Sequence, residues 1–185
     1  CCQNKFFSEL ILIFLINCKS FIFCNPADIN VMDVSSWIAK NKALAVYEKY
    51  KNQLRENLIL AADTVICFNN QVLGKPADRT KAAEYIALLQ GKTHQAVTSL
   101  ALYNIHTEKL SIRKAVCNVK FAPMNKEEIE WYLSTGEWQG AAGAYKIQGK
   151  ASLFIEKIEG TDSCVMGLPL FELYDILREH NYSFF

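Results

Sequence analysis

The chain has 185 residues, of which 51% are hydrophobic, and its formal net charge is only +1. A chain of this size forms one domain, or one domain with two lobes, and buries a substantial core. The near-zero charge argues against a polybasic surface for nucleic acid. We therefore expect a single domain over residues 1–185 that has no nucleic-acid partner.

The cysteines and histidines give no sign of a metal site or a disulfide framework. Seven cysteines are scattered along the chain without a CxxC pair, and the three histidines lack the spacing of metal ligands. An odd and dispersed set of cysteines is typical of reduced thiols in a cytosolic protein. We expect no zinc site and a cytoplasmic location.

The most apolar stretch, Phe6–Cys24, is long enough to suggest a transmembrane helix. Glu9, Asn17 and Lys19 interrupt it, and a charged residue at a helix centre costs about 3 kcal/mol on insertion scales. A signal peptide is disfavoured because only Lys5 precedes the apolar run. We expect a buried helix followed by a strand and no membrane partner, with a membrane-tethered protein as the less favoured alternative.

The first half of the chain alternates helix and strand signals. Asp33 or Ser35 starts a helix that extends to about Leu54, followed by a buried strand at Leu58–Phe68 and a turn at Asn69–Asn70. The apolar stripe expected on this helix consists of Val34, Trp37, Ile38, Leu44 and Ala45.

The second predicted helix begins at Asp78 as its N-cap and stops at Gly91. Its expected core face is Ala82, Tyr85, Ile86 and Leu89. Two strands should follow, near His94–Ile105 and Leu110–Phe121.

The last third of the chain contains two more helices around a strand. Asn125 and Glu128 mark a helix start and Gly136 marks its end, a strand is expected at Ala151–Ile158, and Pro169 opens a final helix. The expected inward residues are Ile129, Tyr132 and Leu133 in the first helix, and Leu170, Leu173, Tyr174 and Leu177 in the second. Strands mixed with helices, without a strict βαβ repeat, predict an α/β fold with a mixed sheet.

The most informative residue is Asp63, which lies inside the apolar run Leu58–Phe68. An unpaired carboxylate there would cost several kcal/mol. Further along, Lys75 is enclosed by Gly74 and Pro76. A carboxylate inside a strand and a cation fixed on the next turn indicate a site for a phosphorylated, metal-bound ligand. On these residues alone, a purely structural Asp–Lys pair is the alternative.

Further motifs favour the first interpretation. Five occur in order: Ala61–Val65 (AADTV), Leu73–Asp78 (LGKPAD), Ser134–Trp138 (STGEW), Gly143–Gly149 (GAYKIQG) and Gly167–Leu173 (GLPLFEL). This set, spread over roughly residues 35–180, resembles the Maf family, also called septum-formation-inhibitor-like proteins, which are nucleoside triphosphate pyrophosphatases. The resemblance implies an elongated twisted sheet with two lobes around a cleft, similar to inosine triphosphate pyrophosphatases.

The resemblance also implies roles for individual residues. Asp63 matches the general base, Lys42 and Lys75 match lysines that contact the phosphates, and Thr64 and Gln148 match positions that select the nucleobase. Helical periodicity does not choose between Lys40 and Lys42, because both flank the expected apolar stripe. Only the resemblance selects Lys42.

The form GAYKIQG is similar to the branch of the family that acts on dTTP and UTP. The implied reaction is hydrolysis to the monophosphate and pyrophosphate with a divalent cation, Mg²⁺ or Mn²⁺, for which Asp63 is a candidate ligand. A homodimer is left open.

The N-terminal residues depart from the family pattern. Cys1–Phe7 aligns with a turn rich in serine and arginine, and Phe6 and Phe7 stand where the family has arginines. Such arginines and helix N-terminal amides bind triphosphate. With the leading strand absent in this alignment, the N-terminal strand and turn are incomplete. The second function left open is therefore an impaired relative that binds nucleotide or a partner without turnover.

Overall fold

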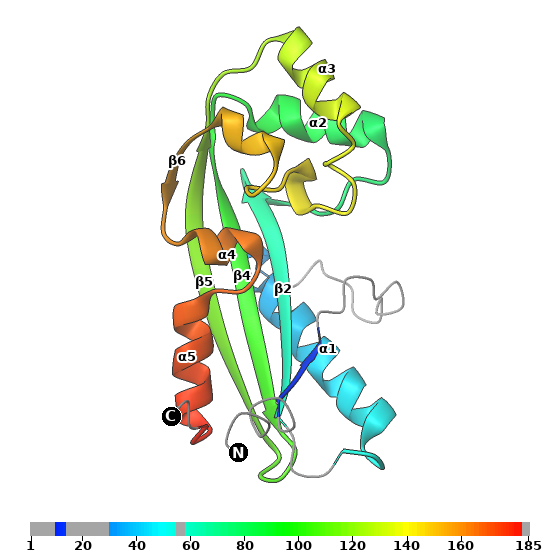
Figure 1. Cartoon of the computed structure of the whole chain (residues 1–185), viewed down its shortest axis with the longest axis vertical. Coiled ribbons are helices and arrows are strands. Elements are labelled where there is room, and N and C mark those ends of the chain that lie inside the picture. The colour runs from blue at the N-terminus through cyan, green and yellow to red at the C-terminus, as the bar shows by residue number, and fades with distance from the viewer. Residues whose placement is uncertain (1–9, 14–29, 55–57, 183–185) are drawn as a thin grey trace, which may run out of the picture. The chain divides into compact units, whose positions relative to one another are not determined.

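The computed structural model describes residues 10–13, 30–54 and 58–182. In chain order the elements are β1 (Leu10–Ile13), the 3₁₀ helix η2 (Val31–Asp33), α1 (Val34–Tyr50), β2 (Leu58–Phe68), β3 (Gln71–Leu73), α2 (Arg79–Leu89), β4 (Thr93–Asn104), β5 (Lys109–Phe121), α3 (Lys126–Ser134), η3 (Ala142–Ala144), η4 (Lys150–Phe154), β6 (Ile155–Glu159), α4 (Asp162–Met166) and α5 (Leu170–Glu179) (Figure 1).

The strands form one mixed sheet, as predicted. Among the described residues the sheet has the order β1-β2-β4-β5-β6, with β3 paired to β2. β1 runs parallel to β2, with Leu10 opposite Leu58, whereas β3 and β6 run antiparallel to their neighbours. A mixed sheet with helices defines an α/β protein and confirms the predicted fold class.

The chain divides into two compact units, and β2, β4 and β5 contribute residues to both. Unit 1 consists of residues 1–63, 98–115 and 170–185, and unit 2 of residues 64–97 and 116–169.

In unit 1, α1 buries its small residues. Ser35, Ala39, Ala43 and Val46 are its buried residues. The predicted stripe of Val34, Trp37, Ile38, Leu44 and Ala45 is only partly buried, and of its members Leu44 packs against the core cluster of this unit. The alanines pack against Ile59 and Ala61 of β2 and Ala101 and Tyr103 of β4, so the small face permits close approach of helix and sheet while the larger side chains flank it.

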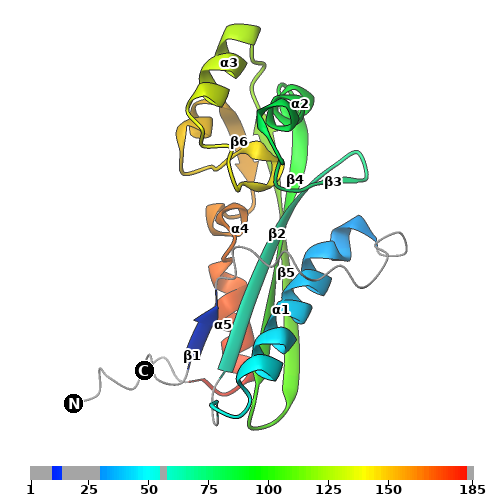
Figure 2. The ribbon, with the colours of Figure 1, turned by 90° about the vertical axis from the view of Figure 1, so that its right-hand side faces the viewer.

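Both faces of the unit 1 strands are covered. Ala101 on β4 packs with α1, while the alternate residues Leu100 and Leu102 are also fully buried. Figure 2 shows α1 and α5 on opposite sides of these strands. This double coverage explains why β2 and β4 are buried along most of their length instead of alternating between buried and exposed residues.

Helix α1 starts at the predicted position but ends earlier than predicted. Asp33 is the N-cap residue by position, but its side chain pairs with Lys114 (2.7 Å) instead of capping the helix. The Ser35 hydroxyl is hydrogen-bonded to Ser99 on β4 (2.8 Å). The helix ends at Tyr50, four residues before the predicted end at Leu54.

Helix α5 docks through fewer apolar residues than predicted. Ile176 and Leu177 are buried, but Leu170 is 60% and Tyr174 43% exposed, so their predicted inward orientation is wrong. Ion pairs supplement the apolar contact. Arg113 on β5 donates to Asp175 and to Glu179, at 2.6 Å in each case.

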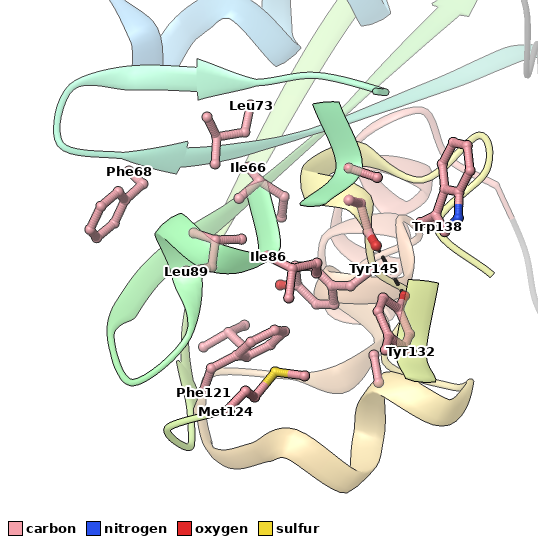
Figure 3. Close-up of a cluster of buried hydrophobic side chains, with 14 of the residues drawn as sticks. Ile66, Phe68, Leu73, Ile86, Leu89, Phe121, Met124, Tyr132, Trp138 and Tyr145 are labelled. Atoms are coloured by element: carbon pink, nitrogen blue, oxygen red, sulfur yellow. Dashed lines mark hydrogen bonds between the residues drawn. The ribbon is translucent and has the colours of Figure 1, made fainter. Parts of the chain in front are cut away.

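In unit 2, α2, α3 and the strand ends enclose the larger core cluster, drawn in Figure 3. Its buried members include Ile66, Ile86, Leu89, Phe121 and Tyr132. The predicted caps are confirmed: Asp78 accepts from Lys81 N, and Asn125 and Glu128 form a reciprocal capping box. These helix starts were readable from sequence because capping depends on local spacing.

The turn predicted between β2 and β3 is also confirmed. Asn69 and Asn70 both have positive φ, 48° and 60°. This is the conformation of a tight hairpin turn, and asparagine tolerates it better than most residues.

The predicted strand Ala151–Ile158 is wrong in its first half. Residues Lys150–Phe154 form the 3₁₀ helix η4, and the strand β6 begins only at Ile155. The amide of Ser152 donates to the carbonyl of Gly149, which closes a tight turn at the point where a strand would need inter-strand bonds.

The helix predicted within Phe6–Cys24 is wrong at Leu10–Ile13, which forms β1. Parallel pairing with β2 satisfies the backbone there. The rest of this segment, and the altered turn at Cys1–Phe7, lie outside the described residues. In the described part of the chain, no helix has the length and apolar character needed to cross a membrane.

The small-residue face of α1 gives a stability prediction. Ala43→Leu adds side-chain volume at a fully buried position, so we expect unfolding to become easier by about 1–3 kcal/mol. Ala45→Leu on the partly exposed side of the same helix is the matched control and should change stability by less than about 0.5 kcal/mol. Urea unfolding measures both, and equal small effects would contradict the assigned face.

Candidate active site

Asp63 and Lys42 form an ion pair in unit 1. The Lys42 ammonium donates to Asp63 Oδ1 at 2.7 Å and to the carbonyl of Ala62 at 3.1 Å. Both side chains are mostly buried, with 12% and 16% exposed. The carboxylate that the sequence places inside an apolar strand therefore has the cationic partner that its burial requires.

The geometry distinguishes Lys42 from Lys40, which the sequence pattern could not do. Lys40 is exposed on α1, whereas Lys42 reaches the backbone and the carboxylate of β2. An ammonium has three donors, and the described residues engage two of those on Lys42. The third can serve a phosphate oxygen.

Thr64 follows Asp63 on β2 and belongs to unit 2. It lies close to Gly167 of the GLPLFEL motif: a Cβ built on Gly167 would come within 3.1 Å of Thr64 Oγ1. Gly167 also has φ +103°, a left-handed conformation that favours glycine. Two predicted motifs thus meet at this threonine.

Lys75 is exposed on the turn after β3, and this turn is tied to the GAYKIQG loop. The Gly143 amide donates to the Gly74 carbonyl at 3.0 Å. Gly143 has φ +64°, and a Cβ there would come within 2.8 Å of Ile66. The close packing and the left-handed backbone together require glycine at this position.

Gln148 is exposed on the loop that runs from Gly143 to Lys150. Two side chains anchor the beginning of this loop. The Tyr132 hydroxyl donates to the Ala144 carbonyl at 3.0 Å (Figure 3), and His94 Nε2 is hydrogen-bonded to the Tyr145 hydroxyl at 2.8 Å.

The sequence pattern did not indicate a role for His94, because its spacing from the other histidines is not that of a metal ligand. His94 lies at the start of β4, is buried, and packs edge-on against Phe121 and Tyr145. Burial lowers its pKa to about 4, so the imidazole is neutral near pH 7. The signal in the sequence is a histidine near the start of a strand whose later residues are mostly buried.

The described residues hold no cluster of three or more His, Cys, Asp or Glu that would bind a metal without a substrate. Mg²⁺ requires less, because it usually keeps waters and takes one or two carboxylates together with substrate phosphates. The hard oxygen ligands of the Asp63 carboxylate fit that mode. The three described cysteines, Cys67, Cys117 and Cys164, are free thiols.

The site residues therefore fall into two groups: Lys42 and Asp63 in unit 1, and Thr64, Lys75 and Gln148 in unit 2. A paired carboxylate, exposed or donor-rich lysines and an exposed amide are groups that suit a nucleotide.

Comparison with known proteins identifies the family. The model of the family described as "Maf-like protein" matches residues 25–180, and the chain belongs to this family.

Several relatives are similar over most of their length. A dTTP/UTP pyrophosphatase of Pelotomaculum thermopropionicum is 37% identical over 158 residues, which cover 85% of this chain and 81% of the relative. A dTTP/UTP pyrophosphatase of Aquifex aeolicus is 40% identical over 144 residues, which cover 78% of this chain and 73% of the relative. A third, from Clostridium botulinum, is 40% identical over 151 residues, which cover 80% of this chain and 77% of the relative.

The lowered pKa of His94 gives a pH prediction. The unfolded histidine has a pKa near 6.5 and the folded one about 4, so between these values the unfolded state binds more protons and stability falls as pH falls. At about 1.4 kcal/mol per pH unit, the loss attributable to His94 is about 3 kcal/mol.

The measurement is the free energy of unfolding from pH 7 to pH 4 in the wild type and in His94→Gln, which keeps a polar group near Nε2 but does not titrate. The wild type should lose about 3 kcal/mol more than the variant over this range. If the free energy of unfolding changed with pH in the same way in wild type and variant, His94 would not be buried in its neutral form.

Proposed function

We propose that this chain is a nucleoside triphosphate pyrophosphatase that hydrolyses dTTP and UTP to the monophosphate and pyrophosphate. The observation that carries the proposal is the Lys42–Asp63 pair on α1 and β2 of a Maf-family chain. The relatives at 37–40% identity named dTTP/UTP pyrophosphatase support the substrate class.

In the proposed reaction Asp63 acts as the general base. It accepts a proton from water as the water oxygen forms a bond to the α-phosphorus, and the bond from that phosphorus to the bridging oxygen breaks. Pyrophosphate leaves with the bridging oxygen. Lys42 keeps the carboxylate in place through its 2.7 Å contact and offers its remaining donor to a phosphate oxygen.

Lys75 is proposed to bind the phosphates from its exposed position between Gly74 and Pro76. The Gly143–Gly74 hydrogen bond and the fixed φ of proline restrict the backbone on both sides of this lysine. A cation on a restricted turn loses less conformational entropy on binding than one on a free loop.

A divalent cation, Mg²⁺ or Mn²⁺, completes the proposal. When bound, it neutralises phosphate charge and polarises the phosphoryl oxygen. Asp63 is the described residue that would hold it together with the substrate's own oxygens.

Thr64 and Gln148 are proposed to select the nucleobase. The amide of Gln148 presents both a donor and an acceptor, and a pyrimidine edge such as that of thymine or uracil has complementary groups. The exposure of Gln148 and the position of Thr64 beside Gly167, both on unit 2, support this assignment.

The proposal includes a cytosolic location and no nucleic-acid or membrane partner. It is supported by the free thiols of the described cysteines and the near-neutral charge of the chain. A homodimer is the proposed assembly to test by light scattering.

The first test is pyrophosphate release from dTTP, UTP and the other triphosphates with Mg²⁺ or Mn²⁺. Asp63→Asn keeps the shape of the side chain but removes the base, so we expect kcat to fall by at least about 10²-fold. Asp33→Asn is the matched control, because Asp33 is exposed in an ion pair with Lys114; it should keep wild-type kcat.

No release by a folded wild-type protein would refute the enzyme. If such a protein still bound dTTP in calorimetry, the result would favour the impaired relative, in which Phe6 and Phe7 replace the expected arginines.

The second test concerns selection of the nucleobase. Gln148→Ala should lower kcat/KM for dTTP and UTP by about tenfold relative to that for the purine triphosphates, the loss expected for a polar contact worth about 1.4 kcal/mol. Gln139→Ala removes an exposed amide from the preceding turn and serves as the control. An unchanged ratio in Gln148→Ala would exclude Gln148 from base selection.

A further inference from the structure

The loop that carries Gln148 is held at both ends by side chains of other segments. Tyr132 and His94 hold Ala144 and Tyr145 at its beginning. The Gln148 side chain itself makes no hydrogen bond to any of the residues that the structure describes. Its position therefore depends on the backbone on either side of it.

Glu137 of the STGEW motif holds the far end. The amide of Lys150 donates to Glu137 Oε2 at 2.6 Å, and the Lys150 ammonium lies 3.9 Å from Oε1. Glu137 follows the Gly136 turn at the end of α3, and its own amide donates to Thr135 Oγ1 at 3.3 Å. The carboxylate is 27% exposed, so water only partly weakens this contact.

Gly149 provides the space for this carboxylate. A Cβ built on Gly149 would collide with Glu137 Oε2. Its backbone is extended (φ −108°, ψ −159°), a conformation that any residue adopts. A side chain at position 149 would therefore displace the Glu137 carboxylate, although the backbone conformation itself does not call for glycine.

We propose that Glu137 is a positioning residue for base selection: by holding the Gly149–Lys150 peptide, it fixes the adjacent Gln148 in the orientation that reads the nucleobase. This inference rests on the proposed function of Gln148.

The physical basis is preorganisation. A hydrogen bond to an ionised carboxylate is about twice as strong as a neutral one. Without it, the Gly149–Lys150 peptide would keep its local turn bonds, from the Gly149 amide to the Lys146 carbonyl and from the Ser152 amide to the Gly149 carbonyl, but would lose its connection to Glu137. The amide of Gln148 would then meet the nucleobase with a larger entropic cost. Glu137 takes no part in the Lys42–Asp63 contact, so its loss should affect discrimination and KM more than kcat.

The test compares kcat and KM for dTTP and for the purine triphosphates in four variants. Glu137→Ala and Gly149→Ala disrupt the same contact from its two sides, and both should reduce the preference for dTTP about tenfold, with kcat for dTTP changed less than about threefold. Glu137→Gln retains a carbonyl acceptor for the Lys150 amide and should recover part of the preference. Glu127→Ala, an exposed glutamate on α3, is the matched control.

Two further measurements separate positioning from general damage. The double variant Glu137→Ala/Gly149→Ala should be no worse than either single variant, because residues that share one contact are not additive. Hydrogen exchange of the Lys150 amide in nucleotide-free protein should be faster in Glu137→Ala than in wild type.

The outcomes distinguish this inference from the proposed function. A wild type that hydrolyses no triphosphate refutes the function, and amide exchange then still tests the Glu137 contact. A wild type that prefers dTTP, with an unchanged preference in Glu137→Ala, overturns the positioning role. Exchange at Lys150 that is equally fast in wild type and variant also overturns it.

Discussion

The constraint on which the candidate site depends is the carboxylate of Asp63 within the apolar strand β2. Such a group is tolerated only with a partner, and Lys42 supplies one from α1 at 2.7 Å. The reach of Lys42 depends in turn on the close approach of α1 to the sheet, which the small residues Ala39 and Ala43 permit. A choice of small residues in the core thus fixes the distance between two charged groups.

The elements that were predicted correctly are those specified by local spacing. The capping box of Asn125 and Glu128, the Asp78 cap, the Asn69–Asn70 turn and the strand Leu58–Phe68 each follow from neighbouring residues. The errors arose where tertiary contacts decide. The exposed Leu170 and Tyr174 were expected to face inward, but α5 is also held by Arg113, whose partners lie more than sixty residues away in sequence.

The candidate site likewise contains residues that the sequence indicated and residues that only the structure shows. The apolar strand and the Gly-Lys-Pro turn singled out Asp63 and Lys75, and the motif resemblance added Lys42, Thr64 and Gln148. The ion pair of Lys42 and Asp63 agrees with the partner expected for a buried acid. The sequence shows His94 near the start of a strand and Glu137 within a motif, but it does not show which residues of the loop they hold, because those partners lie elsewhere in the chain. Their importance appears only in the hydrogen bonds.

The hydrogen bond from Gly143 to Gly74 joins the lysine turn to the loop that carries Gln148. In the proposed enzyme these segments read opposite ends of one nucleotide, yet neither backbone can shift without disturbing the other. Evolution of a new base preference by remodelling the loop would therefore alter affinity for the phosphates as well. Divergence within this family should favour side-chain exchanges on a retained loop over insertions into it.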